Sequence, residues 1–235
     1  MITTLLFDLD GTLLPMEQDI FTNEYLRLLC AKMAPLGYEA KALVQGIWAG
    51  VSAMVKNTGQ RTNEEVFWDC FTSQFGESSR AHIPFFNEYY ANDFQKVARV
   101  CGYQPQAKAL LAQLKLKGIR TILATNPLFP AVATYSRIRW AGLQPEDFSY
   151  ITTYENAHFC KPNPAYYREI LERTGCSAEE CLMVGNDVGE DMVAEQLGMQ
   201  TFLLTDCLIN SQKADISRFP QGGFGQLQCF LQPIL

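Results

Sequence analysis

Histidine and paired cysteine, the usual ligands of zinc, are scarce in this sequence. Histidine occurs only at positions 82 and 158, and the eight cysteines are scattered, with no C-x-x-C pair. A zinc site needs His and Cys side chains clustered at short spacing, so we predict none. We expect the thiols to pack as small hydrophobic side chains in a reducing compartment rather than to form disulfides.

The sequence also lacks an excess of basic residues. Lys and Arg number 19 against 25 Asp and Glu, which gives a net charge of −6. Proteins that bind nucleic acid normally carry a basic stripe, so we expect no nucleic-acid partner.

No long apolar run is present either. Every stretch falls short of the roughly 18 uninterrupted apolar residues of a membrane span. The first residues of the chain carry no basic segment, and Asp8 and Asp10 follow soon after, unlike in a signal peptide. We therefore expect no membrane association and a cytoplasmic location.

Short, β-rich apolar runs alternate with helical patterns over most of the 235 residues, of which 48% are hydrophobic. The runs lie at 2–8, 119–125, 148–153, 181–186 and 199–205. Helical patterns lie at 107–116, 130–139, 164–174 and 190–197. Strands that alternate with helices predict an α/β fold with a parallel sheet covered on both faces. The tail at 219–224 reads as a loop before a final helical turn.

Residues 15–98 differ from the rest, because they show four amphipathic helical patterns and no strand. Thr62 and Glu65 form a capping box at the start of one of these helices, and the last one is predicted over 83–100. The segment is rich in aromatic residues: Trp48, Phe67, Trp68, Phe71, Phe75, Phe85, Phe86, Tyr89, Tyr90 and Phe94. We interpret it as a helical insertion whose aromatic side chains form a packed core, with one or two left to line a pocket.

Two carboxylates, Asp8 and Asp10, come at the end of the first predicted strand, and Gly11 next to them permits a tight turn. In an open α/β sheet, ligands bind at the carboxyl ends of the strands. A plainer interpretation is that both residues only cap a turn.

Further polar groups follow other predicted strands. Thr125 and Asn126 offer a hydroxyl and an amide suited to phosphate oxygens, and Lys161 precedes a helix. Asp187 and Asp191 form a second acidic pair after the strand at 181–186. Because these groups share the carboxyl ends of successive strands, we expect them to form one site.

In this combination the sequence resembles the haloacid dehalogenase-like (HAD) superfamily of phosphohydrolases. The resemblance rests on D-x-D-G-T-L at 8–13, on Thr125, on Lys161-Pro162 and on the Asp187/Asp191 segment. It implies a Rossmann-like core over 1–14 and 99–235 and a mobile α-helical cap of four helices over 15–98. It also implies a small phosphorylated substrate.

The resemblance implies a role for each residue. Asp8 is the nucleophile that forms an aspartyl-phosphate, and Asp10 is the general acid and base. Thr125, Asn126 and Lys161 bind the phosphate, and Lys161 and Thr125 stabilise the charge on its oxygens during transfer. Mg²⁺ is held by the Asp8 carboxylate, the Asp10 carbonyl and the acidic segment with Asp191.

One position departs from the family pattern, in which Gly-Asp is followed by a second Asp five residues later. Counting from Gly185 places Asn186 at the first position. Either Asn186 ligates the metal through its amide oxygen or Asp187 does so after a shift of one residue. We favour Asp187, because a carboxylate is the better ligand.

Asp10 separates the activities within the family, because the dehalogenases lack a carboxylate at this position. Its presence favours a phosphatase or a phosphomutase, and a phosphatase is our main prediction. A phosphomutase of the same family is one alternative, and a non-catalytic ligand-binding or regulatory module on this fold is another.

Overall fold

Six parallel strands form one sheet in the order β3-β2-β1-β4-β5-β6 in the computed structural model, which describes residues 1–235. The strands are β1 Thr4–Phe7, β2 Arg120–Leu123, β3 Tyr150–Ile151, β4 Cys181–Gly185, β5 Gln200–Leu204 and β6 Gln221–Gly222. β1 is first in the sequence but lies in the middle, between β2 and β4. The predicted α/β class is confirmed, and all five predicted strands are present.

Three segments differ from the prediction. Gln221 and Gly222, expected in a loop, pair with β5; a strand of two residues has no alternation from which to predict it. The helix predicted at 190–197 is a 3₁₀ segment, Met192–Leu197. The helix predicted over 83–100 ends at Ala91 and continues as a 3₁₀ segment from Asp93, since Asn and Asp compete with helical hydrogen bonds.

Helices cover both faces of the sheet. The helices of this part are α5 Pro105–Leu116, α6 Ala131–Trp140, α7 Pro164–Thr174 and α8 Phe224–Leu231. Leu6 of β1 belongs to the cluster that contains Tyr166 of α7. Leu5, whose side chain points the opposite way, belongs to the cluster with Leu110 of α5 and Leu227 of α8.

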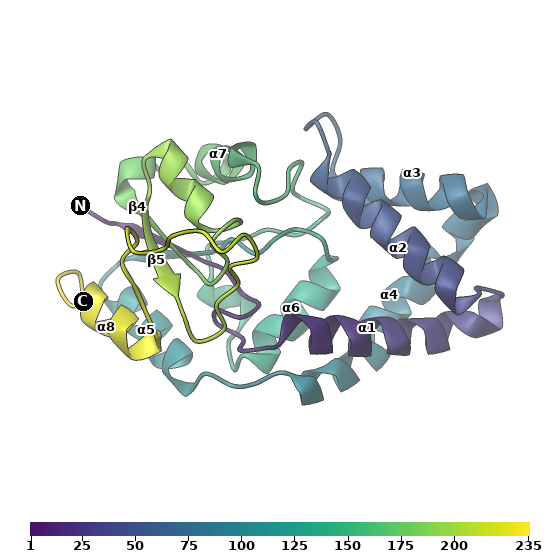
Figure 1. Ribbon diagram of the computed structural model, residues 1–235, viewed down its shortest axis with the longest axis horizontal. Coiled ribbons are helices and arrows are strands. Elements are labelled where there is room, and N and C mark those ends of the chain that lie inside the picture. Colours follow the sequence, from purple (N-terminus) through teal and green to yellow (C-terminus); the bar gives the residue numbers. More distant parts are fainter.

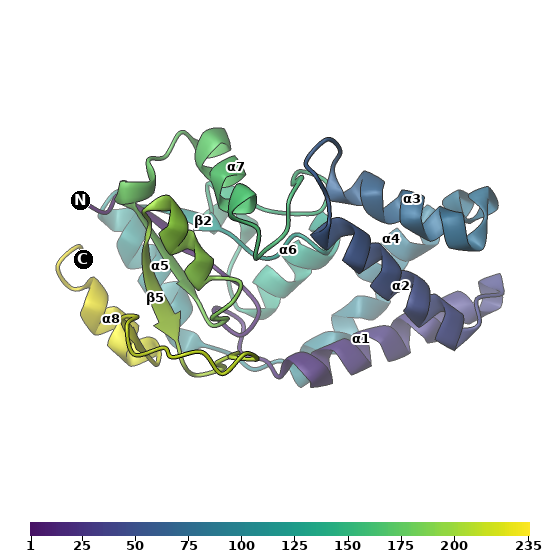
Figure 2. The same ribbon diagram turned by 45° about the horizontal axis from the view of Figure 1, so that its top comes forward.

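The insertion contains the four helices expected, α1 Gln18–Met33, α2 Ala40–Val55, α3 Asn63–Phe75 and α4 Ile83–Ala91. They lie together at one end of the molecule, away from the sheet, in both views (Figures 1 and 2). The capping box of Thr62 and Glu65 at the start of α3 is confirmed. By length and hydropathy, none of the chain's helices qualifies as a membrane span.

Two glycines of α2 let it pack closely against α3. A Cβ atom on Gly50 would lie 2.4 Å from Cδ2 of Phe67, and one on Gly46 would lie 2.4 Å from Cε2 of Phe75. Any side chain at these positions therefore pushes the two helices apart.

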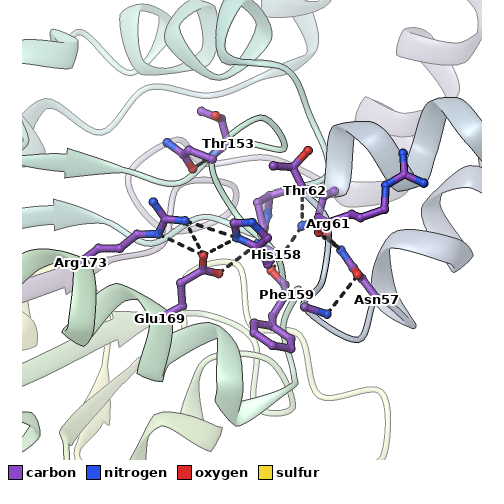
Figure 3. Close-up of polar contacts among 12 residues, drawn as sticks. Asn57, Arg61, Thr62, Thr153, His158, Phe159, Glu169 and Arg173 are labelled. Carbon is purple, nitrogen blue, oxygen red and sulfur yellow. Dashed lines mark hydrogen bonds and ion pairs between the residues drawn. The ribbon is translucent and has the colours of Figure 1, made fainter.

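The loop between β3 and α7 is held on one side by the insertion. The backbone N–H groups of Asn63 and Glu64 donate to the carbonyls of Ala157 and Tyr154, at 2.9 and 2.8 Å. The buried Asn63 also donates from Nδ2 to the carbonyl of Phe159 at 3.3 Å. Figure 3 shows the turn between α2 and α3 beside Phe159.

On its other side, the same loop is held by α7. Glu169 accepts a hydrogen bond from the backbone N–H of His158 at 3.0 Å and lies 2.7 Å from Nδ1 of that ring (Figure 3). Arg173 donates to Glu169 at 2.8 Å. Burial raises the pKa of Glu169, but the hydrogen bonds from His158 and Arg173 outweigh burial and hold this pKa below its ordinary value. Lys161 follows three residues after His158, so this loop positions it.

Gly50→Ala should destabilise the protein by about 1–3 kcal/mol, because the new methyl group clashes with the buried ring of Phe67. Gly225→Ala in α8 is the matched control, since a Cβ there meets nothing within 4 Å. The control should gain up to about 1 kcal/mol from helix propensity. Urea unfolding measures both, and a stabilised Gly50→Ala would contradict the close packing.

Glu169→Gln should lower the free energy of unfolding by about 1–2 kcal/mol at pH 7, because the neutral amide cannot replace the charge-assisted contacts. The pKa of Glu169 is lower in the folded protein than the ordinary value of 4.5 that applies to the unfolded chain. Ionised Glu169 therefore stabilises the fold fully above pH 4.5, and this stabilisation is lost as the pH falls through the pKa of the folded state. The difference between variant and wild type should therefore shrink below pH 4.5. The exposed Glu172, changed to Gln, is the control; equal effects of the two changes would contradict this role.

Candidate active site

A cavity of about 250 Å³ lies at the carboxyl ends of the central strands. It is lined by seven of the eight residues predicted for the site: Asp8, Asp10, Thr125, Asn126, Asn186, Asp187 and Asp191. They meet there because β1 pairs with both β2 and β4, so the three strands end side by side. The eighth, Lys161, is buried behind the cavity wall and contacts Asp8.

Lys161 lies between two carboxylates. Its Nζ donates to Oδ1 of Asp8 at 2.8 Å and to Oδ1 of Asp191 at 2.6 Å. The Lys161 side chain is fully buried and that of Asp191 is 1% exposed, so water screens neither charge. The other oxygen of Asp191 accepts from the backbone N–H of Asp187 at 2.9 Å. This leaves Oδ2 of Asp8 without a hydrogen bond, beside the cavity.

Gly11 makes the turn after Asp10 and packs it against β4. Its φ of 83° lies in the left-handed region that favours glycine. A Cβ at Gly11 would also lie 2.3 Å from Nδ2 of Asn186. Next to it, the hydroxyl of Thr12 donates to Oδ1 of Asn186 at 3.0 Å. The turn of the first motif is thereby fixed to the first residue after β4.

Asn186 and Asp187 point to different partners. Nδ2 of Asn186 donates to the carbonyl of Cys207 at 2.6 Å, and the residue is 2% exposed. Oδ1 of Asp187 accepts from the backbone N–H groups of Gly189 and Glu190, at 2.7 and 3.0 Å. The Asp187 carboxylate thus caps its own turn, whereas the Asn186 amide contacts the turn that follows Asp10.

Arg137 of α6 is a charged neighbour that the sequence interpretation missed. It is 1% exposed and forms an ion pair with Oδ2 of Asp10. Its guanidinium carbon lies 4.4 Å from the centre of the Phe129 ring. Oδ1 of Asp10 is buried and has no partner. Burial raises the pKa of Asp10, and the charges of Arg137 and Lys161 oppose this rise. The helical period gives a signal, since Arg137 lies one turn after the buried Ala133.

Thr125 and Asn126 form the third side of the cavity. The carbonyl of Thr125 accepts from the hydroxyls of Thr152 and Tyr166, at 2.6 and 2.9 Å, which fixes the end of β2. Nδ2 of Asn126 donates to Glu190 at 2.9 Å, and its buried Oδ1 has no partner. Glu190 is a second residue that the sequence interpretation missed.

Negative charge exceeds positive charge around this cavity. Its five carboxylates belong to Asp8, Asp10, Asp187, Glu190 and Asp191. Only Lys161 and Arg137 contact them as cations. Burial raises the pKa of Asp8 to about 8 against the lowering effect of Lys161, and burial raises that of Glu190 to about 7. A further cation would stabilise the ionised carboxylates. No group of three or more His, Cys, Asp or Glu side chains has the arrangement of a metal site.

Comparisons with known proteins agree with this geometry. The chain is 25% identical over 203 residues to a phosphoglycolate phosphatase of Aliivibrio fischeri. This alignment covers 85% of the present chain and 82% of the relative. The chain spans about half the length of the other curated relatives that it matches, which are named glyceraldehyde 3-phosphate phosphatase and phosphoglycolate phosphatase.

Solved structures share the whole fold. A 2-haloacid dehalogenase of Pseudomonas syringae pv. Tomato has a TM-score of 0.62 at 23% identity, with all of both chains covered. A HAD-type hydrolase of Bacillus subtilis, bound to magnesium, has a TM-score of 0.56 at 20% identity, with 99% of this chain and 98% of that one covered.

The family model for haloacid dehalogenase-like hydrolases matches residues 2–198. This range includes all the residues that line the cavity except Ile209. The protein therefore belongs to the haloacid dehalogenase-like hydrolases.

Proposed function

We propose that this protein is a Mg²⁺-dependent phosphatase that hydrolyses a small phosphomonoester through an aspartyl-phosphate on Asp8. The observation that carries the proposal is the arrangement around Asp8. Lys161 holds one oxygen of this carboxylate at 2.8 Å, while the other has no hydrogen bond and lies beside the cavity. An anchored carboxylate with one unengaged oxygen is suited to in-line attack on phosphorus.

The reaction then proceeds in two steps. Oδ2 of Asp8 forms a bond to phosphorus while the bond from phosphorus to the ester oxygen breaks, and protonated Asp10 gives its proton to the departing alkoxide. Water next attacks the phosphorus and loses a proton to Asp10. The bond between phosphorus and Asp8 breaks, and inorganic phosphate leaves. Thr125 and Asn126 bind the phosphoryl oxygens in both steps, and the charge of Lys161, held beside Asp8, stabilises the negative charge on these oxygens.

Asp10 favours phosphate ester chemistry over dehalogenation. A halide needs no proton when it leaves, whereas an alkoxide does. The ion pair with Arg137 fixes one oxygen of Asp10, and the unpartnered Oδ1 is left for a proton. Arg137 thus orients the acid–base group.

The excess of carboxylates fits a divalent cation with oxygen ligands. We propose that the Asp8 carboxylate, the Asp10 carbonyl and the side chain of Asn186 or Asp187 hold Mg²⁺, with Asp191 close by. Of the two, the contacts favour Asn186, because its amide lies against the turn after Asp10 while Asp187 caps its own turn. When bound, Mg²⁺ offsets negative charge on the carboxylates and on the phosphoryl group.

We also propose that the four-helix insertion acts as a cap that excludes bulk water during phosphoryl transfer.

All eight cysteines are free thiols. This is consistent with the reducing cytoplasm that we propose as the location of the protein.

Asp8→Asn should lower the rate of aryl phosphate hydrolysis at least about a thousandfold, because the neutral amide cannot act as the nucleophile. Release of phosphate is measured with and without Mg²⁺. The matched control is Asp215→Asn, the same chemical change in an exposed loop. Retained activity in Asp8→Asn would exclude the mechanism. Tight binding of a phosphomonoester by wild type without turnover would indicate a binding module instead.

Asn186→Asp should lower the Mg²⁺ concentration for half-maximal activity on the order of tenfold, because a carboxylate replaces a neutral ligand. Asp187→Asn, the reverse change one residue away, should shift it less than about threefold. Mg²⁺ titrations of activity, or of Mn²⁺ binding followed by electron paramagnetic resonance, measure both. A larger shift in Asp187→Asn would assign the ligand to Asp187.

A further inference from the structure

A second cavity adjoins the catalytic one, and it is apolar. It has a volume of about 100 Å³ and lies between the cap helices and the segment after β2. Phe21, Trp48, Val51 and Phe67 are among its lining residues, and none of the lining residues is charged. Trp48 is 50% exposed, so this wall is reached from solvent.

The two cavities are adjacent, since Gln18, Leu128 and Phe129 line both. A phosphoryl group placed at Asp8 therefore has the apolar cavity beside it. The part of the substrate that extends from the phosphate, its alcohol, is the group placed to occupy that cavity.

No side-chain cation is available for a second negative charge on the substrate. No Lys, Arg or His lines either cavity. Lys161 is engaged by Asp8 and Asp191, and Arg137 by Asp10. A substrate carboxylate would thus be buried unpaired among apolar side chains, close to the acidic cluster, and both effects oppose binding.

Polar groups in the apolar cavity are also largely satisfied within the protein. The hydroxyls of Tyr25 and Tyr90 bond to each other at 3.0 Å, and Nε1 of Trp68 donates to the hydroxyl of Tyr154 at 3.4 Å. Gln18 and Thr22 are the remaining polar side chains in the lining. A sugar with several hydroxyl groups would leave most of them without partners.

The volume limits the size of the group. An apolar cavity of about 150 Å³ accepts benzene, so 100 Å³ accepts a group of about four carbon atoms.

From this geometry we infer the substrate class: a phosphomonoester of an uncharged, apolar alcohol with a short branched alkyl chain. This inference rests on the proposed function, and it differs from the phosphorylated acid and aldehyde in the names of the curated relatives.

Two phosphates of equal shape test the inference. 4-Methylpentyl phosphate ends in an isopropyl group, and 4-(phosphonooxy)butanoate carries a carboxylate in its place. Their binding to Asp8→Asn is measured by calorimetry with Mg²⁺ present, which needs no turnover. The branched alkyl ester should bind at least about tenfold more tightly, because two methyl groups become buried and no charge is desolvated. Equal binding, or tighter binding of the carboxylate, would overturn the inference.

Hydrolysis of the same two esters by wild type, with methyl phosphate as a reference that lacks a tail, separates the two claims. If none of the three is hydrolysed but the alkyl ester binds better, the proposed function fails and the apolar site stands. If all three are hydrolysed without preference for the alkyl ester, the function stands and the inference fails.

A pair of variants on α1 locates the selectivity. Thr22→Lys places a cation in the lining, and Ile20→Lys places the same charge on an exposed position of the same helix. Thr22→Lys should improve binding of the carboxylate ester about tenfold and weaken that of the alkyl ester. Ile20→Lys should change neither. The same response to both variants would place the alcohol outside this cavity.

Discussion

The buried ammonium group of Lys161 is the interaction on which the site depends. It lies within hydrogen-bonding distance of Asp8 and Asp191, whose carboxylates come from the ends of two neighbouring strands. Without this cation, two buried negative charges would face each other in a region that excludes water, at a cost of several kcal/mol. Lys161 therefore makes the convergence of β1 and β4 electrostatically possible and also orients the carboxylate that we propose as nucleophile.

The strand order explains why so few residues suffice to build the site. β1 lies between β2 and β4, so the first motif is adjacent to both later ones although more than a hundred residues separate them in the sequence. Each strand contributes only the residues that follow its last hydrogen-bonded pair. The chemistry is thus concentrated at one edge, and the insertion after β1 is free to shape the rest of the pocket.

Much of this arrangement could be predicted from the sequence, because it depends on local patterns. Apolar runs that end in polar residues predicted the strands and brought together Asp8, Thr125 and Asp187. Arg137 was missed because its partner Asp10 lies 127 positions away. The helical period places Arg137 on the face of the buried Ala133 but does not identify that partner. The pairing of Gln221 with β5 and the break at Asn92 were missed because each depends on tertiary neighbours or on one or two residues.

The contacts of Asn63 have a consequence for how the pocket is reached. Its backbone N–H and side chain, together with the N–H of Glu64, bind carbonyl groups of the segment that leads to Lys161. Lifting the start of α3 would break these bonds, each worth about 0.5–1.5 kcal/mol, and would release that segment at the same time. A protein opened at this point would therefore hold Lys161 less firmly. Opening at the start of α3 and the position of Lys161 are in this way coupled, so the site that we propose is complete only while these bonds are in place.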